Sequence, residues 1–213
     1  YELYYDKKIC ILKTVHENIK KKLKKNIKIL KIFLYLLSFN TNYFKIINSF
    51  KMDDFENFLV NQADMNLESN NLKIFHKIFL SYDMIHIPKY YENDEYNLIM
   101  SKVNGIKLYD FLKTNPESKI DVINLIYSCI HKMVSNKIIH GDFHQGNILF
   151  FKIDNNVNIS ILDFGLVFIL SNKQSEIILD YLESFKKIHL IQLINTFGNN
   201  IENKNEILKT NKK

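Results

Sequence analysis

The sequence lacks arginine and tryptophan, and it holds only 5 glycines, 2 prolines and 2 cysteines in 213 residues. All 29 basic residues are therefore lysines, and the formal net charge is +6. A basic chain favours an anionic partner. Arginine, however, is the usual residue for bidentate contacts with phosphates and guanine edges. Its absence argues against sequence-specific nucleic-acid binding, and we expect no nucleic-acid partner.

Two further absences narrow the class of protein. Cys10 and Cys129 lie far apart without a C-x-x-C spacing, which argues against a disulfide framework and a zinc cluster. No signal peptide is visible, and the longest purely apolar run, residues 32–37, is too short to span a bilayer. We therefore expect a cytoplasmic or membrane-associated chain. Because the sequence opens without Met and almost at once enters a strand pattern, we also expect it to be a segment of a longer protein.

The hydrophobic pattern predicts an α+β fold. Apolar residues recur at a spacing of three to four over residues 19–39, 53–80 and 173–197, which is typical of helices. Residues 9–15 have the β-branched character of a strand, and a strand pair surrounds the polar turn at 92–95. A short helix follows at "KLYDFLKT", and Pro116 lies near the start of a longer helix that ends at about Asn136.

The window of residues 138–168 holds three of the five glycines and the densest set of candidate site residues. "NILFFKID", the polar "NNVN" and "ISILDFG" predict a hairpin that brings Asn147 close to Asp163. An amide oxygen and a carboxylate are hard ligands suited to Mg²⁺. Asp142, five residues before Asn147, lies where it can accept a proton beside that metal. Phosphoryl transfer needs this combination of groups.

The joint pattern D-x-x-x-x-N, apolar hairpin and D-F-G predicts a kinase-type catalytic loop, although each part alone is weak. Such a site also needs a strand lysine that holds the ATP phosphates and a helix glutamate that pairs with it. Lys13 is the lysine inside a strand pattern ("CILKTV"), and Glu68 lies in the helical "ADMNLESNNLKIF". Taken separately, either residue is better interpreted as an exposed surface charge, but given the predicted metal site the pair is the better interpretation.

Several segments resemble the UbiB family of atypical kinases, which is associated with coenzyme Q biosynthesis. They are "KTVHENI", "QADMNLESNNLKIF", "IPKYYENDEYNLIMSKVNGIKL", "HGDFHQGNIL" and "LDFGLVFILSNKQ". That family carries a helical insertion between its strand lysine and helix glutamate, and Lys13 and Glu68 are 55 positions apart. The family loop resembles H-x-D-P-H-P-G-N, to which four residues here correspond: Asp142, His144, Gly146 and Asn147.

The resemblance implies a protein-kinase-like two-lobed fold with ATP and Mg²⁺ as cofactors. Residues 1–100 would form a small, incomplete N-lobe with inserted helices, and residues 101–213 a mostly helical C-lobe. By this resemblance Lys13 would bind the ATP phosphates and act in catalysis, and Glu68 would pair with Lys13. Asn147 and Asp163 would bind the metal, and Asp142 would be the catalytic aspartate. The backbone of Ser101 and Val103, which follow Met100, would contact adenine. The implied function is an atypical kinase or ATPase that acts near isoprenoid or quinone lipid metabolism, with an isoprenoid lipid as acceptor and peripheral membrane contact.

The sequence departs from the family pattern at several positions. Gln62 replaces the glutamate of an E-x-D motif, Phe143 and Gln145 replace two prolines of the catalytic loop, and Glu17 replaces the proline of a K-x-x-H-P pattern. No G-x-G-x-x-G motif is present. In the family, a K-x-G-Q segment and the loop that covers the nucleotide precede the strand lysine, so we expect both of them outside this sequence.

These departures leave two alternatives open. A small-molecule phosphotransferase of the aminoglycoside or choline kinase type uses a similar H-G-D, Asn and D-x-G arrangement. A nucleotide-binding pseudokinase scaffold would fit Gln62 and the missing nucleotide loop.

For other features of the sequence we prefer structural roles. We expect His144 to brace the catalytic loop, lysines 20–25 to form a solvated helix face, and the aromatic residues of 33–44 to pack in a core.

Overall fold

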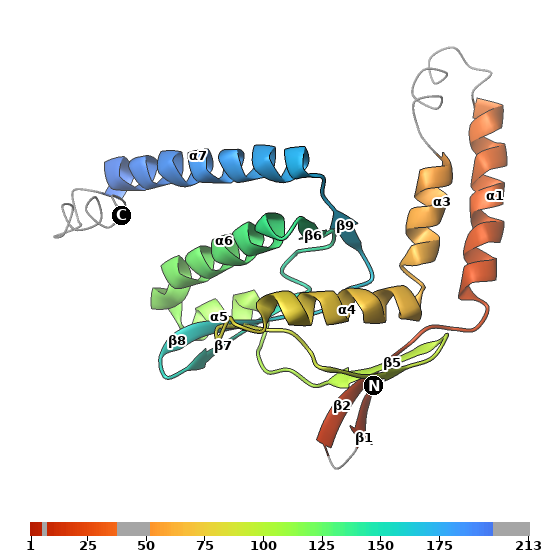
Figure 1. Ribbon diagram of the computed structural model, residues 1–213, viewed down its shortest axis with the longest axis horizontal. Coiled ribbons are helices and arrows are strands. Elements are labelled where there is room, and N and C mark those ends of the chain that lie inside the picture. The colour runs from red at the N-terminus through yellow and green to blue at the C-terminus, as the bar shows by residue number, and fades with distance from the viewer. Residues whose placement is uncertain (6–7, 38–51, 198–213) are drawn as a thin grey trace. The chain divides into compact units, whose positions relative to one another are not determined.

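The computed structural model describes residues 1–5, 8–37 and 52–197, with side chains given to residue 184 except at Asp54 (Figure 1). These residues form two compact units. The first contains the described residues of Tyr1–Cys129 and His140–Phe168, and the second contains Ile130–Ile139 and the described residues from Ile169 onward. All the predicted site residues lie in the first unit. The predicted division into residues 1–100 and 101–213 stays a prediction.

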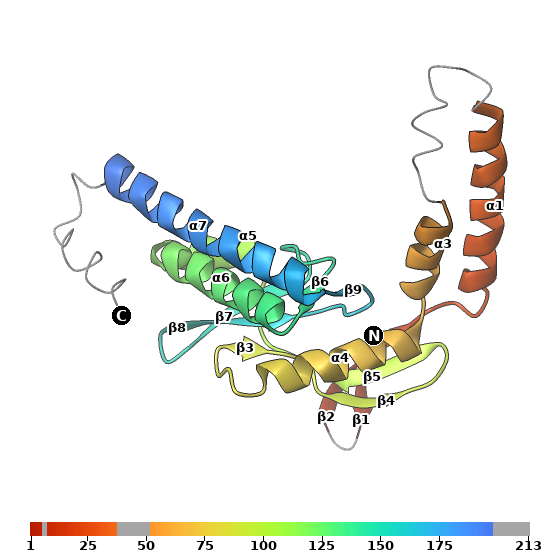
Figure 2. The same cartoon turned by 45° about the horizontal axis from the view of Figure 1, so that its top comes forward.

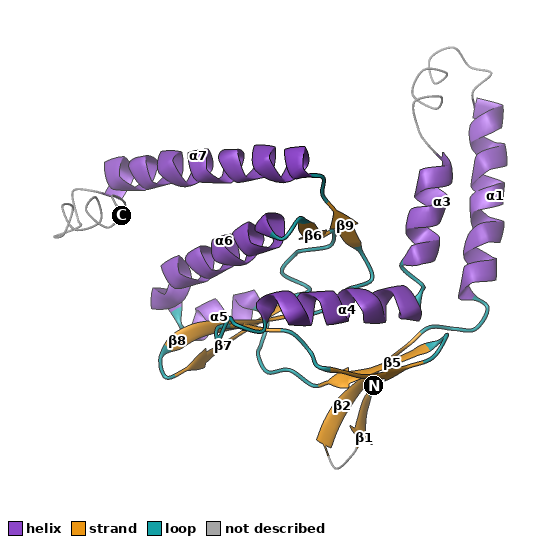
Figure 3. Ribbon diagram, in the orientation of Figure 1, coloured by secondary structure: helices purple, strands orange, loops and turns teal. Residues whose placement is uncertain are grey.

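A four-stranded antiparallel sheet carries Lys13 (Figure 3). Its strands are β1 (Glu2–Tyr5), β2 (Lys8–Thr14), β4 (Tyr90–Asn93) and β5 (Asn97–Ser101), in the order β1-β2-β5-β4. The expected strand at 9–15 corresponds to β2 and the expected pair to β4 and β5, whereas the sequence did not reveal β1. Lys13 lies opposite Leu98 in the β2–β5 register, and the buried Cys10 and Leu98 anchor this part of the sheet.

The helical pattern predicted over residues 53–80 is confirmed, and it is divided between two elements. The structure contains two helices there, α3 (Met52–Asn61) and α4 (Met65–Phe79). The side chain of Asp64 caps α4 by accepting hydrogen bonds from the N–H groups of Asn66 and Leu67, at 3.0 and 3.2 Å. Such a cap satisfies N–H groups that a helix leaves unpaired at its start. The chain therefore breaks at residues 62–64 and begins a new helix that holds Glu68.

Helix α4 packs against the sheet along β4 and β5, as the two views show (Figures 1 and 2). Its buried face follows helical spacing and comprises Met65, Glu68, Ser69, Asn71, Leu72, Phe75 and Phe79. Three members of this face are polar, which is unusual for the side of a helix that covers a sheet. Two of them, Glu68 and Asn71, form hydrogen bonds with the candidate site that are described below, whereas the hydroxyl of Ser69 donates to the carbonyl of Asn66 within the helix.

Helix α1 (Ile19–Leu37) packs against α3, and Lys31 joins them through ion pairs of 2.8 Å with both Asp53 and Glu56. The expectation that the aromatic residues here pack in a core was wrong for Phe33 and Tyr35, which are 54% and 65% exposed. The expected aromatic residues after Leu37 lie outside the described residues, as do the last two residues of the helix predicted at 19–39. Among the described helices, none combines the length and the apolar character that crossing a bilayer requires.

The predicted hairpin of the 138–168 window is formed by β7 (Ile148–Ile153) and β8 (Asn156–Ile161). Its turn is tighter than the expected "NNVN", because only Asp154 and Asn155 connect the strands. Both have positive φ angles, 48° and 68°, as in a type I′ turn that suits hairpin twist. The short strand β3 (Ile85–His86) pairs in parallel with β8 and completes a three-stranded sheet.

The remaining elements follow the expected order. Helix α5 (Leu108–Thr114) is the predicted short helix, and the 3₁₀ turn η1 (Pro116–Ser118) leads into α6 (Lys119–Ser135). The strands β6 (Ile138–His140) and β9 (Val167–Ile169) form a two-stranded sheet before and after the hairpin. In the second unit, α7 (Asn172–Phe197) is held near its start by Ser175, whose hydroxyl donates to the carbonyl of Val134 at 2.7 Å.

Candidate active site

Lys13 forms ion pairs with two carboxylates from distant parts of the sequence. Its Nζ lies 2.8 Å from Oε1 of Glu68 on α4 and 2.9 Å from Oδ1 of Asp163 after β8. The side chain of Glu68 is fully buried, while that of Lys13 is 30% exposed. The three charged groups selected from sequence motifs therefore lie together, although up to 150 positions separate them in the chain.

Burial and charge shift the pKa values of all three groups. Burial alone would lower the pKa of Lys13, but the charges of Glu68 and Asp163 outweigh it and raise that pKa above its usual value. Burial raises the pKa of Glu68, because the attraction of Lys13 offsets only part of the lost hydration. The pKa of Asp163 is lowered: burial would raise it, but the charge of Lys13 and its hydrogen bond prevail. Lys13 and Asp163 are thus held in their charged forms.

The catalytic loop places Asp142 beside Asn147. The Nδ2 group of Asn147 donates to Oδ2 of Asp142 at 2.9 Å and to its backbone carbonyl at 3.0 Å. His140, which is almost fully buried, receives a hydrogen bond at Nδ1 from the N–H of Asp142 and donates from Nε2 to the carbonyl of Leu162. This assigns the neutral tautomer with the proton on Nε2. Asp142 itself is half exposed, so a hydroxyl can reach it from solvent.

His144 braces the same loop. Its Nδ1 accepts the N–H of Gly146 at 2.8 Å, and its Nε2 lies 3.3 Å from Oδ1 of Asp142. The ring lies so close to Gly146 that a Cβ atom there would approach it within 2.5 Å. The glycine therefore makes room for the imidazole, and the lysine ammonium of Lys107 holds the carbonyl of Gly146 at 2.5 Å. Sequence reasoning had not selected Lys107.

Asp163 and Asn147 flank the open end of the β7–β8 hairpin. The N–H of Leu162 donates to the carbonyl of Asn147 at 2.8 Å, so the two side chains leave neighbouring strands at the same level. Asp163 has a positive φ of 57°, and its Oδ1 accepts the N–H of Gly165 at 3.2 Å. A non-glycine residue in this conformation stores backbone strain that functional sites commonly retain.

Helix α4 holds the D-F-G segment at a second point. The Nδ2 group of the buried Asn71 donates to the carbonyl of Phe164 at 2.8 Å, one turn after Glu68. The ring of Phe164 packs against Phe75 and His140, with centroid separations of 5.1 and 5.6 Å. Sequence reasoning missed Asn71. A polar residue three positions after Glu68, on the predicted buried face of the helix, was the signal that could have revealed it.

A cavity of about 620 Å³ opens beside these groups. Five of the seven predicted site residues line it: Lys13, Ser101, Val103, Asn147 and Asp163. Glu68 lies behind Lys13, and Asp142 lies on the catalytic loop beside Asn147. The rest of the lining is largely apolar and includes Ile11, Leu12, Met100, Leu149 and Leu162. A cavity of this size with an apolar wall and a few charged groups at one end suits a nucleotide, whose base and phosphates differ in polarity.

The donor set at the charged end fits a magnesium ion bound together with phosphates. Asn147 uses its amide nitrogen on Asp142, and its carbonyl oxygen has no partner among the described residues. Asp163 offers the oxygen that does not contact Lys13. Two protein oxygens suit Mg²⁺, which usually completes its shell with phosphate and water.

Comparison with known protein families identifies the fold that carries this site. The ABC1 atypical kinase-like domain matches residues 3–193, which is most of the chain. The chain belongs to this family. The resemblance to the UbiB family and the expected α+β, protein-kinase-like fold are thereby confirmed.

Individual relatives are similar at low identity. The EKC/KEOPS complex subunit BUD32 of Enterocytozoon bieneusi is 26% identical over 163 residues, which cover 67% of this chain and 75% of that protein. The chloroplastic protein ACTIVITY OF BC1 COMPLEX KINASE 1 of Arabidopsis thaliana is 27% identical over 135 residues, or 61% of this chain and 19% of that protein. This chain thus spans about a fifth of the Arabidopsis relative.

A solved structure shows the same fold. The protein Rv3197 of Mycobacterium tuberculosis, determined in complex with erythromycin, superimposes with a TM-score of 0.55 and 15% sequence identity. The match covers 79% of this chain and 43% of the mycobacterial chain. The likeness supports a kinase-like architecture, and it carries no information on what this chain binds.

Proposed function

We propose that this chain binds ATP with Mg²⁺ and transfers the γ-phosphoryl group to a hydroxylated acceptor or to water. The observation that carries the proposal is the convergence of Lys13, Glu68 and Asp163 at one end of a nucleotide-sized cavity. Membership of an atypical kinase-like family supports it. Kinase-type phosphoryl transfer depends mainly on positioning and on charge stabilisation, which these residues are suited to provide.

Each residue has a defined part in this proposal. Lys13 binds phosphate oxygens by charge, and Glu68 keeps its ammonium directed into the cavity. Asn147 and Asp163 would hold Mg²⁺, which when bound would neutralise charge on the phosphates. Asp142 accepts the proton of the attacking hydroxyl, because its carboxylate is half exposed beside the metal ligands.

The Lys13–Asp163 ion pair has a consequence for nucleotide binding. In the structure Asp163 uses one oxygen on Lys13, at 2.9 Å, and Glu68 uses the other side of the same ammonium. Lys13 would contact phosphates with the ammonium that now pairs with Asp163, and Asp163 would then be free to hold Mg²⁺. We therefore infer that the affinity for nucleotide depends on the metal and the affinity for the metal depends on nucleotide. Nucleotide binding at Lys13 would free Asp163 for the metal, and metal binding at Asp163 would free Lys13 for the phosphates.

For the acceptor we propose an isoprenoid or quinone-related lipid reached by peripheral membrane contact, as the family resemblance implies. One structural feature favours it. Helix α1 exposes apolar side chains among its lysines, including Ile29, Ile32, Phe33 and Leu36. An amphipathic basic helix of this kind suits the surface of an anionic membrane.

Conversion of ATP to ADP by the purified chain tests the proposal, with wild type beside Asp142→Asn. Removal of a general base typically costs 10²- to 10⁴-fold in rate. We expect Mg²⁺-dependent ADP formation that falls by about 100-fold or more in the variant. Nucleotide binding without any turnover, in wild type as in the variant, would instead favour the pseudokinase scaffold. Rapid turnover on an added aminoglycoside or choline would favour a small-molecule phosphotransferase.

A further inference from the structure

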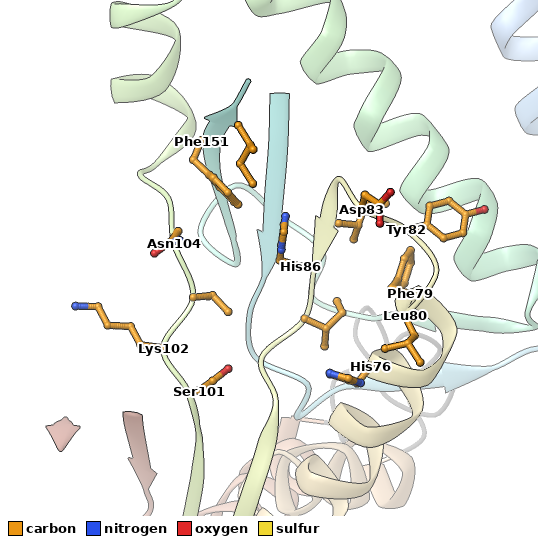
Figure 4. Close-up of a pocket in the computed structure, with 14 residues that line it drawn as sticks. His76, Phe79, Leu80, Tyr82, Asp83, His86, Ser101, Lys102, Asn104 and Phe151 are labelled. Atoms are coloured by element: carbon orange, nitrogen blue, oxygen red, sulfur yellow. The ribbon is translucent and has the colours of Figure 1, made fainter. Parts of the chain in front are cut away.

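A second cavity, of about 460 Å³, lies on the other side of the segment that follows β5 (Figure 4). Ser101, Lys102 and Val103 line both this cavity and the candidate nucleotide cavity, so residues 101–103 form a wall between the two. The remaining walls come from the end of α4, from the loop before β3 and from β7. We call this space the rear cavity. It has the volume of a small-molecule site.

The lining of the rear cavity combines polar and apolar surface in about equal parts. Phe79 and Ile85 are buried in its wall, and Val103, Phe151 and Ile153 contribute further apolar surface. The ring of Phe151 lies against the imidazole of His86, with centroids 5.0 Å apart. In Figure 4 Phe151 and Phe79 stand at opposite ends of the space, with His86 between them. An apolar ligand body of about the size of one ring fits these walls.

Two polar groups of the rear cavity, the half-buried His86 and the exposed Asp83, each offer an acceptor that has no partner among the described residues. Nε2 of His86 lies 3.1 Å from Oδ1 of Asn158, whose Nδ2 donates elsewhere, so Nε2 carries the proton and Nδ1 is an acceptor. Nδ1 of His86 and the carboxylate of Asp83 have no hydrogen bond to any residue that the structure describes. A ligand that satisfies both groups must donate hydrogen bonds.

Lys102, the lysine on the lining of the rear cavity, is not a counterion for Asp83. The ammonium of Lys102 pairs with Glu2 at 2.6 Å, and Figure 4 shows its side chain directed away from the cavity. The carboxylate of Asp83 is therefore the one charge on the lining that lacks a counterion among the described residues. A cation complements it better than a neutral molecule or an anion does.

We propose that the rear cavity binds small primary amines with an apolar body. The protonated amine donates to the carboxylate of Asp83 and to Nδ1 of His86, and the apolar body packs between Phe79 and Phe151. This site is separate from the proposed nucleotide site and does not depend on it. Because residues 101–103 belong to both walls, we also expect a bound amine to change the dissociation constant of ATP.

Ligand-detected NMR with three probes that share a phenethyl group tests the site: phenethylamine, 2-phenylethanol and 3-phenylpropionate. They share the ring and differ in charge. We expect phenethylamine to bind most tightly and to shift the ring resonances of His86, and we expect 3-phenylpropionate not to bind. Asp83→Asn should weaken phenethylamine about fivefold, the upper range for an exposed ion pair, and leave 2-phenylethanol unchanged. Asp121→Asn, an exposed carboxylate on α6, is the matched control.

A second variant separates occupancy from folding. Ile153→Lys places an ammonium at the exposed rim of the cavity, where folding tolerates it, and should abolish phenethylamine binding. Equal binding of the amine and the acid, or unchanged binding in both variants, would overturn the proposal. So would displacement of phenethylamine by ATP with Mg²⁺, since it would place the probe in the nucleotide cavity. An ATP dissociation constant unaffected by saturating phenethylamine would refute the coupling across residues 101–103.

Discussion

Replacement of Lys13 by methionine should destabilise the fold because it leaves Glu68 as a buried charge. Removing one partner of a buried ion pair typically costs about 3–5 kcal/mol. Glu68 is 0% exposed, and its Oε2 has no hydrogen-bond partner among the described residues. Lys13 is 30% exposed, which places the expected cost at the lower end of that range. We expect the free energy of unfolding to fall by about 3 kcal/mol at pH 7.

Glu68→Gln should behave differently, because it removes the charge whose burial is costly. Lys13 keeps Asp163 as its partner at 2.9 Å. The raised pKa of Glu68 reports that its ionised form is disfavoured by burial. We expect this variant to lie within about 1 kcal/mol of wild type, because Lys13 is 30% exposed and keeps an ionic partner, so no buried charge is left unpaired. The double variant Lys13→Met/Glu68→Gln should recover about 2 kcal/mol of the loss caused by Lys13→Met.

Urea unfolding followed by far-UV circular dichroism measures these changes, since the chain has no tryptophan to report by fluorescence. Lys8→Met, an exposed lysine on the same strand, is the control and should change stability by less than about 0.5 kcal/mol. The deficit of Lys13→Met should shrink on acidification, because protonation of Glu68 replaces the lost counterion. A double variant as unstable as Lys13→Met would refute the argument, since the buried charge would not then be the cause.

Three further predictions concern the surroundings of the site. Asn71→Asp replaces the group that donates a hydrogen bond to the Phe164 carbonyl by an acceptor. In calorimetry, the affinity for ATP with Mg²⁺ should therefore fall at least tenfold, while the affinity for ATP without Mg²⁺ should change less than threefold. Burial lowers the pKa of His140, so the NMR shifts of its ring should titrate below the ordinary value of about 6.5. The stability that the neutral ring contributes should be lost as the pH falls through that lower pKa. Gly105→Ala should lower the free energy of unfolding in urea by about 2 kcal/mol, because φ is +125° and a Cβ would lie 2.7 Å from that of Leu149.

Each of these predictions has a result that contradicts it. Equal losses of ATP affinity with and without Mg²⁺ in Asn71→Asp would indicate general damage to the fold; Asn70→Asp, on the exposed side of α4, controls for the added charge. Titration of the His140 ring above 6.5 would mean that its two hydrogen bonds do not fix the neutral form. Wild-type stability in Gly105→Ala would show that the backbone there relaxes.

The catalytic part of the fold was predictable because its signals are local. The β7–β8 hairpin follows from two apolar runs joined by Asp and Asn, and Asn147 and Asp163 lie at its ends because of strand register. The ion pair of Lys13 with Glu68 was inferred from the needs of a kinase-type site and then from the family resemblance, since 55 positions separate the two residues and many lysines compete. No periodicity in the sequence encodes such a long-range contact.

Other features could not be predicted for identifiable physical reasons. The break between α3 and α4 depends on the side chain of Asp64, which caps a helix here although the apolar spacing continues across it. The exposure of Phe33 is a tertiary property, because helical periodicity marks an apolar face without telling what covers it. The donation from Asn71 to Phe164 joins residues 93 positions apart. The rear cavity likewise depends on how four separate segments meet.

Isothermal titration calorimetry with ATP, in the presence and absence of Mg²⁺, tests the central claim most directly. Wild type should bind ATP more tightly with Mg²⁺, because Asn147 and Asp163 would hold the ion against the phosphates. Asp163→Asn should remove that dependence on Mg²⁺ and retain weak binding of ATP through Lys13. Binding of ATP that is equally tight with and without Mg²⁺ in wild type, or no binding at all, would contradict the account.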